Sequence, residues 1–218
     1  MNFFISFLSK YSLAPLVRLL FIKDIKGIDN LPKKNFILAS NHQSYLDIPL
    51  CGYVCVPRRF TFIGQVDRKE GWNFIRNIIY LITEVIPVNR GDKNSKDRAF
   101  LKAVEMIKKG YCLNIYPEGT RSKTGEVQEG KWGVAKLFLE TEVPVVPLGI
   151  SGAFDIFPPG QKPKVKKVVK LNIGKPMFFK EELEKSKNIS SSSEQYKDIC
   201  IEITNKIMEE IKRLVHEN

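Results

Sequence analysis

The residues best suited to acid–base chemistry lie in the stretch Asn41–Asp47 (NHQSYLD). The chain has two histidines, and His216 lies near its carboxyl end, where disorder is common. If the protein needs a general base near neutral pH, His42 is the candidate. Asp47 could accept a hydrogen bond from Nδ1–H of His42, which would fix the tautomer and leave Nε2 as the base. The alternative is that Asp47 only caps a helix and His42 only lies in a loop.

A strand followed by a helix should position these two side chains. Residues 35–40 (NFILAS) form a short apolar run that ends in polar residues, which predicts a buried strand. Ser44 and Asp47 have the spacing of a capping box, which predicts that a helix begins there. His42 would then lie at the carboxyl end of a strand, where open α/β sheets bind ligands. On one continuous helix, His42 and Asp47 would instead lie about 140° apart.

A second polar loop, Tyr116–Ser122 (YPEGTRS), follows a predicted strand over residues 111–116. Pro117 should end the strand, and Gly119 permits a tight turn. Arg121 has a planar guanidinium suited to a phosphate group, and Glu118 could hold Arg121 or accept a hydrogen bond from a substrate hydroxyl. The side chains at this second strand end are thus Glu118, Thr120 and Arg121.

Two further basic residues could add positive charge near this loop. Arg90 follows a predicted strand over residues 84–89, and Lys131 opens a predicted helix over residues 131–140. For Arg90, Lys131 and Arg121 alike, the alternative is a surface salt bridge. The sequence has no Gly-x-Ser-x-Gly elbow, which disfavours a hydrolase with its own nucleophile, and no Walker A or Gly-x-Gly-x-x-Gly loop.

The remaining patterns predict an α/β fold with a mixed, largely parallel sheet flanked by helices, because strands and helices alternate along the chain. The other predicted strands are 59–65, 143–150 and 165–173, and the other predicted helices are 45–56, 72–82, 96–109 and 194–215. The prolines of residues 143–150 (VPVVPLGI) suggest an edge-like or irregular strand. Five lysines in residues 162–170 suggest a solvated edge or a lipid-facing strand.

The N-terminal segment is apolar and has a basic flank. Residues 3–22 are rich in Phe, Leu and Ile, and residues 1–34 carry six basic and two acidic side chains. This combination is typical of a helix that lies in the interface of an anionic membrane. An ordinary helix that covers the core, or a transmembrane span, are the alternatives. We therefore divide the chain into an interfacial helical segment, residues 1–30, and a folded domain, residues 31–218.

Composition indicates a folded protein with an anionic partner. The formal net charge is +11 and the pI is about 9.4, although such an excess can also serve only solubility. Aromatic stripes beside basic residues are not evident, so we expect no nucleic acid as partner. The cysteines do not have zinc-knuckle spacing, so we expect four free, buried thiols and no metal site.

Four blocks of the sequence together resemble the glycerolipid acyltransferases. Residues 41–47 resemble their NHxSxxD motif, also written HX4D, and residues 116–122 resemble FPEGTRS. Residues 86–90 (IPVNR) resemble the intervening motif that ends in arginine, and residues 143–148 (VPVVPL) resemble the fourth, apolar block. The blocks occur in the family's order over residues 36–150, and the nearest subfamily is the 1-acyl-sn-glycerol-3-phosphate acyltransferases, or lysophosphatidic acid acyltransferases.

This resemblance implies an enzyme of phospholipid biosynthesis at the cytoplasmic face of the cell membrane, bound peripherally or as a monotopic protein. It would transfer a fatty acyl chain from acyl-ACP (acyl carrier protein) or acyl-CoA to the sn-2 hydroxyl of lysophosphatidic acid, giving phosphatidic acid. The thioester is a co-substrate, and no cofactor or metal is expected.

The resemblance also assigns roles to single residues. His42 and Asp47 would be catalytic, and the substrate-binding residues would be Arg90, Glu118, Gly119, Thr120, Arg121 and Lys131. Backbone amides near Gly119 are candidate donors to the oxyanion. Asn89 stands where the family often has an acidic residue, which makes Arg90 a weaker assignment than Arg121. Two other hypotheses are a sister acyltransferase for a different lysolipid and a non-enzymatic basic module that binds membranes.

Overall fold

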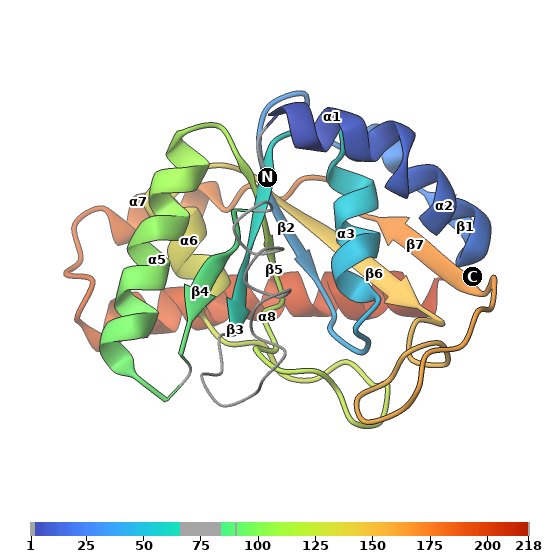
Figure 1. Ribbon diagram of the computed structural model, residues 1–218. Helices are drawn as coiled ribbons and strands as arrows, with labels where there is room; N and C mark the ends of the chain where they lie inside the picture. The colour runs from blue at the N-terminus through green and yellow to red at the C-terminus, as the bar shows by residue number, and fades with distance from the viewer. Residues whose placement is uncertain (1–2, 66–83, 90, 218) are drawn as a thin grey trace.

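A seven-stranded sheet forms the centre of the protein in a computed structural model that describes residues 3–65, 84–89 and 91–217 (Figure 1). The strand order is β1-β7-β6-β2-β5-β3-β4, and among these described strands only β6 and β7 pair antiparallel. The strands are β1 (Ile22–Lys26), β2 (Ile37–Ser40), β3 (Phe60–Gln65), β4 (Ile86–Val88), β5 (Cys112–Ile115), β6 (Val145–Ser151) and β7 (Val169–Ile173). The predicted mixed, largely parallel α/β class is confirmed.

Helices cover both faces of the sheet (Figure 1). On one face lie α1 (Phe3–Tyr11), α2 (Leu13–Leu20) and α3 (Asp47–Cys55), and on the other lie α5 (Lys93–Lys108), α6 (Gly133–Thr141) and α8 (Glu194–His216). A short 3-10 turn, η1 (Ile28–Asn30), and α7 (Lys180–Ser186) complete the described elements. The central strand β2 shows why both layers are needed, because Ile37 and Ala39 face one apolar cluster and Leu38 faces the other.

The helix α8 crosses behind the sheet and packs closely on β6 (Figure 1). It presents Ile199, Ile203, Ile207 and Ile211 to the core, at the predicted repeat of four. Gly149 of β6 permits this approach, since a Cβ there would lie 2.5 Å from the carbonyl carbon of Leu214 and 2.6 Å from the backbone nitrogen of Val215. The side chain of Ser193 caps the helix by accepting from the N–H of Tyr196.

The strand β6 corrects an expectation from the sequence. It lies inside the sheet between β2 and β7 and is buried almost throughout, so the predicted edge position is wrong. Pro147 is tolerated because the ladder to β7 begins only at Leu148, so no neighbouring strand requires its missing N–H. Its carbonyl still accepts from Gly174.

The N-terminal segment is helical only as far as Leu20. Residues 22–26, predicted as part of a helical segment, form β1 at the edge of the sheet and pair in parallel with β7. Among the described helices, none is both long and apolar enough to cross a membrane. The lysine-rich residues 162–167 are an exposed loop, and the strand begins only at Val169. The predicted helix over residues 72–82, and Arg90, lie outside the described residues.

Candidate active site

The two polar loops meet at the carboxyl edge of the sheet because β2 and β5 are parallel neighbours. His42 follows the end of β2, and Tyr116 follows the end of β5. The N–H of Ser122 donates to the carbonyl of His42 at 2.7 Å, which joins the loops directly. The structure therefore brings together residues that are more than seventy positions apart in the sequence.

His42 and Asp47 form the hydrogen bond that the sequence predicted. The Nδ1 atom of His42 lies 2.7 Å from Oδ2 of Asp47, and both residues are buried, at 5% and 0% exposure. The same Oδ2 accepts from the backbone N–H groups of Gln43 and Ser44, each at 2.8 Å. A carboxylate that already accepts two N–H groups favours Nδ1 as the protonated ring nitrogen, which leaves Nε2 as the basic position.

The capping box forms only in part. The helix α3 begins at Asp47, whose carboxylate accepts from the N–H of Ser44 as a capping box requires. Ser44 Oγ, however, accepts from the N–H of Leu46 and donates to the carbonyl of Phe157. The serine thus fastens the loop to the segment after β6, and the aspartate turns toward His42.

Amide side chains on either side of His42 fix the loop to β6. Asn41 both donates to the carbonyl of Ile150 and accepts from its N–H, at 2.9 and 2.8 Å. Gln43 Nε2 donates to the same carbonyl at 2.6 Å. Sequence reasoning missed these contacts, although two amides flanking a candidate base were a visible signal.

Glu118 has a different position from the one expected. Its Oε1 accepts from the backbone N–H of His42 at 2.9 Å, and its Oε2 accepts from Gln128 Nε2 at 2.7 Å. It is 3% exposed, and within the described residues it neither pairs with Arg121 nor lines the cavity beside His42. Among the described contacts, Glu118 bonds His42 and Gln128 in place of the expected Arg121, and its hydrogen bond to a substrate hydroxyl stays a prediction.

The rest of the second loop divides into residues that reach the cavity and residues that do not. Arg121 lines the cavity, where its guanidinium lies 4.0 Å from the ring centroid of Tyr45 and its Nε donates to the carbonyl of Ser44 at 3.3 Å. Thr120 is exposed and is not among the described lining residues.

Gly119 lies in the left-handed region, with φ of 72°, as a tight turn requires. A Cβ at Gly119 would come within 3.0 Å of Lys131 Nζ, so the glycine makes room for that lysine. The N–H of Gly119 donates to the carbonyl of Tyr116 at 3.0 Å. This N–H is therefore used within the turn, and the role of the neighbouring amides as oxyanion donors stays a prediction.

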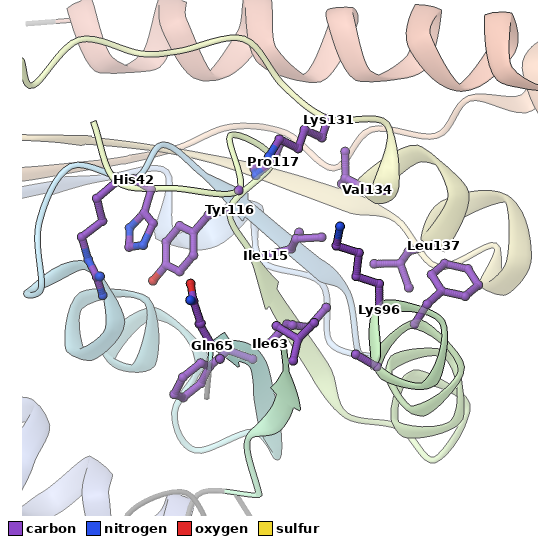
Figure 2. Close-up of a pocket in the computed structure, with 18 of the residues that line it drawn as sticks. His42, Ile63, Gln65, Lys96, Ile115, Tyr116, Pro117, Lys131, Val134 and Leu137 are labelled. Atoms are coloured by element: carbon purple, nitrogen blue, oxygen red, sulfur yellow. The ribbon is translucent and has the colours of Figure 1, made fainter. Parts of the chain in front are cut away.

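A cavity of about 690 Å³ extends from His42 along the carboxyl ends of the strands (Figure 2). Its polar end holds His42, Tyr116 and Arg121, and Gln65 also lines it. Its far end is largely apolar, with Ile63, Val88, Ala99, Phe100, Ile115, Val134 and Leu137 among the lining residues. The shape and lining suit a ligand with one charged end and one apolar end.

Two lysines line this cavity beyond Arg121. Lys131 reaches it as expected, from a position two residues before α6. Lys96 of α5 also lines the cavity, which was not predicted. On an amphipathic helix the sequence does not distinguish a lysine in a cavity from a lysine in solvent. Figure 2 shows both side chains at the wall of the cavity.

The four cysteines are free and buried, as expected. In the described part of the chain, no group of three or more His, Cys, Asp or Glu side chains could hold a metal ion.

A comparison with protein-family models matches residues 23–151 to the family described as Acyltransferase. The chain belongs to this family. The matched residues include the two loops that carry His42 and Arg121 to the cavity, and the strand β6 that anchors the first of them.

Named relatives lie within one group of acyltransferases. A chloroplastic 1-acyl-sn-glycerol-3-phosphate acyltransferase of Brassica napus is 34% identical over 143 residues, covering 64% of this chain and 40% of that protein. A probable 1-acyl-sn-glycerol-3-phosphate acyltransferase of Mycoplasma pneumoniae is 30% identical over 142 residues, covering 62% of this chain and 52% of that protein. The chain thus spans about half the length, or less, of these curated relatives.

The fold is also similar to a solved structure. The crystal structure of the 1-acyl-sn-glycerophosphate (LPA) acyltransferase PlsC from Thermotoga maritima superposes with a TM-score of 0.63 at 28% identity. The match covers 89% of this chain and 73% of that one.

Glu118 should make stability depend on pH in an unusual direction. Burial raises the pKa of its carboxyl from 4.5 to about 7, so between these values the folded protein retains a proton that the unfolded chain releases. Relative to Glu118→Gln, the free energy of unfolding of the wild type should therefore fall by roughly 2–4 kcal/mol as the pH rises from 4.5 to 8. Urea denaturation at several pH values measures this difference.

The control is Glu129→Gln, which removes an exposed carboxylate on the same loop. A difference between wild type and Glu118→Gln that stays constant with pH would contradict the buried, proton-retaining carboxyl.

Proposed function

We propose that this protein transfers a fatty acyl chain from an acyl thioester to the sn-2 hydroxyl of 1-acyl-sn-glycerol 3-phosphate, giving phosphatidic acid. The observation that carries the proposal is the buried His42–Asp47 hydrogen bond at the charged end of a cavity whose far end is largely apolar. Family membership and the names of the relatives support the same reaction. They also speak against a non-enzymatic basic module.

In this reaction His42 Nε2 removes the proton of the acceptor hydroxyl while its oxygen attacks the thioester carbonyl. Asp47 holds Nδ1–H and balances the imidazolium that forms. The tetrahedral oxyanion then collapses, the carbon–sulfur bond breaks, and the thiolate leaves with the proton returned by His42. The products are the ester and a free thiol, with no acyl-enzyme intermediate.

The charged groups of the cavity suit the acceptor phosphate. Arg121 lies beside His42 and offers a planar fork, and Lys131 supplies further positive charge next to Gly119. We place Arg90 in the same role by its motif alone. The apolar far end of the cavity suits an acyl chain. Both acyl-ACP and acyl-CoA remain donor hypotheses, and a basic surface suits the acidic carrier.

Removal of the His42 imidazole tests its role as the base. His42→Ala should lower turnover by roughly 10²–10⁴, the usual contribution of a general base, while the fold and the binding of lysophosphatidate persist. Release of free thiol from an acyl thioester measures turnover. His216→Ala, which removes the exposed second histidine, is the control and should behave as wild type. Near-normal turnover of His42→Ala would eliminate the mechanism.

Removal of the Arg121 guanidinium tests its contact with the acceptor phosphate. Arg121→Ala should raise the acceptor KM roughly 10- to 100-fold, the effect of losing a charge-assisted hydrogen bond, and leave the thioester KM within about twofold. Lys123→Ala, an exposed cation on the same loop, is the control. An unchanged KM would remove Arg121 from phosphate binding. Equal turnover of lysophosphatidate and a lysophosphatidylethanolamine would favour the sister-enzyme hypothesis.

We further propose that α1 and α2 bind the surface of an anionic membrane at the cytoplasmic face. Large apolar side chains on both helices are exposed, among them Phe4 at 74%, Leu8 at 57% and Leu19 at 65%. Lys10 lies in the last turn of α1 and Arg18 in the last turn of α2, which adds positive charge beside the apolar surface. Such a peripheral contact would bring the enzyme to a lipid acceptor.

Vesicle co-sedimentation tests the membrane contact. The double variant Leu16→Ser/Leu19→Ser should bind phosphatidylglycerol vesicles at least about 10-fold more weakly than wild type. The reason is that binding would no longer transfer two apolar side chains from water into the membrane interface. Leu101→Ser removes an equally exposed leucine from α5, 66% exposed, and is the control. Equal binding by both variants would contradict the assignment of this surface.

A further inference from the structure

Tyr116 lies flat against the imidazole of His42. The ring centroids are 3.8 Å apart and the ring planes differ by 11°. Figure 2 shows the two rings side by side at one end of the cavity, with Leu137 at the other. This contact covers a face of the imidazole and is separate from the edge contact with Asp47.

The Tyr116 ring is itself held in place from two sides. Its main chain follows directly from β5, so its Cα position is set by the sheet. Its hydroxyl donates to Cys51 Sγ at 3.7 Å, and the same sulfur lies 3.5 Å from Ser40 Oγ. Cys51 belongs to α3 and Ser40 ends β2, so the phenol is fastened to the two elements that also carry Asp47 and His42.

We propose that Tyr116 is a positioning residue for His42. The ring of Tyr116 fixes the plane of the imidazole, and the π-face of the same ring stabilises the imidazolium. The inference rests on the proposed function of His42 as general base. The hydrogen bond to Asp47 fixes the Nδ1 edge of the imidazole but does not by itself fix rotation of the ring about the Nδ1–Oδ2 axis. The stacked ring removes that rotation and so directs Nε2.

The electrostatic part of this role acts after proton transfer. The neutral imidazole gains little from the π-face of Tyr116, whereas a cation over such a face is attracted by its quadrupole. The gain therefore occurs on the way to the transition state and should appear in kcat rather than in KM. The ring carries this effect, and the hydroxyl only anchors the ring.

Two substitutions separate the ring from the hydroxyl. Tyr116→Phe keeps the stacked ring, so its kcat should stay within about threefold of wild type. Tyr116→Leu removes the ring, so its kcat should fall about 10-fold while the KM values of thioester and lysophosphatidate change less than about twofold. Tyr116→Met fills the same volume with a flexible thioether and is the second ring-free variant if the leucine variant does not fold.

Nuclear magnetic resonance gives a readout that needs no turnover. With 15N-labelled histidine the protein shows two imidazoles, and exposed His216 serves as internal reference. We expect one sharp Nδ1–H tautomer for His42 in wild type and Tyr116→Phe, and a broadened or mixed signal in Tyr116→Leu.

The outcomes distinguish the two proposals. Wild-type kcat together with a single sharp tautomer in Tyr116→Leu would overturn the positioning role. A KM that rises as much as kcat falls would overturn it as well, because Tyr116 would then act on the substrate. Absence of thiol release from wild type with every lysolipid would overturn the proposed function, and the resonance comparison would still decide whether Tyr116 orders His42.

Discussion

The hydrogen bond between His42 and Asp47 depends on several other hydrogen bonds that hold the backbone of the loop around them. Asp47 also accepts two N–H groups from its own loop, and Glu118 holds the N–H of His42 from the neighbouring loop. Asn41 and Gln43 bind the flanks of the same loop to β6. Three strands of the sheet therefore converge on one imidazole, which explains why the site lies where parallel strands end side by side.

The sequence was informative where structure is local. His42 and Asp47 lie five residues apart across a strand end and a helix start, and both elements have clear patterns, so their contact could be predicted. The repeat of Ile199, Ile203, Ile207 and Ile211 likewise identifies the buried face of α8 without any knowledge of its partner.

Contacts between segments that are distant in the sequence could not be predicted in the same way. The role of Glu118 depends on which strand lies next to β2, and the tolerance of Pro147 depends on where the ladder to β7 begins. Lys96 looks like any solvated lysine until α5 is packed beside the cavity. Each of these features follows from strand order, which hydrophobic periodicity does not encode.

The buried position of Cys51 under Tyr116 has a consequence for the kinetic order of the reaction. Burial raises the pKa of this thiol to about 12, so near neutral pH only about one molecule in 10⁵ would carry the thiolate that attacks thioesters. This sulfur is thus a hydrogen-bonding group beside Tyr116 that is poorly suited to accept the acyl chain by thiol exchange. In the proposed reaction the acceptor hydroxyl attacks the thioester directly, so donor and acceptor would occupy the protein together and the kinetics would be sequential rather than ping-pong.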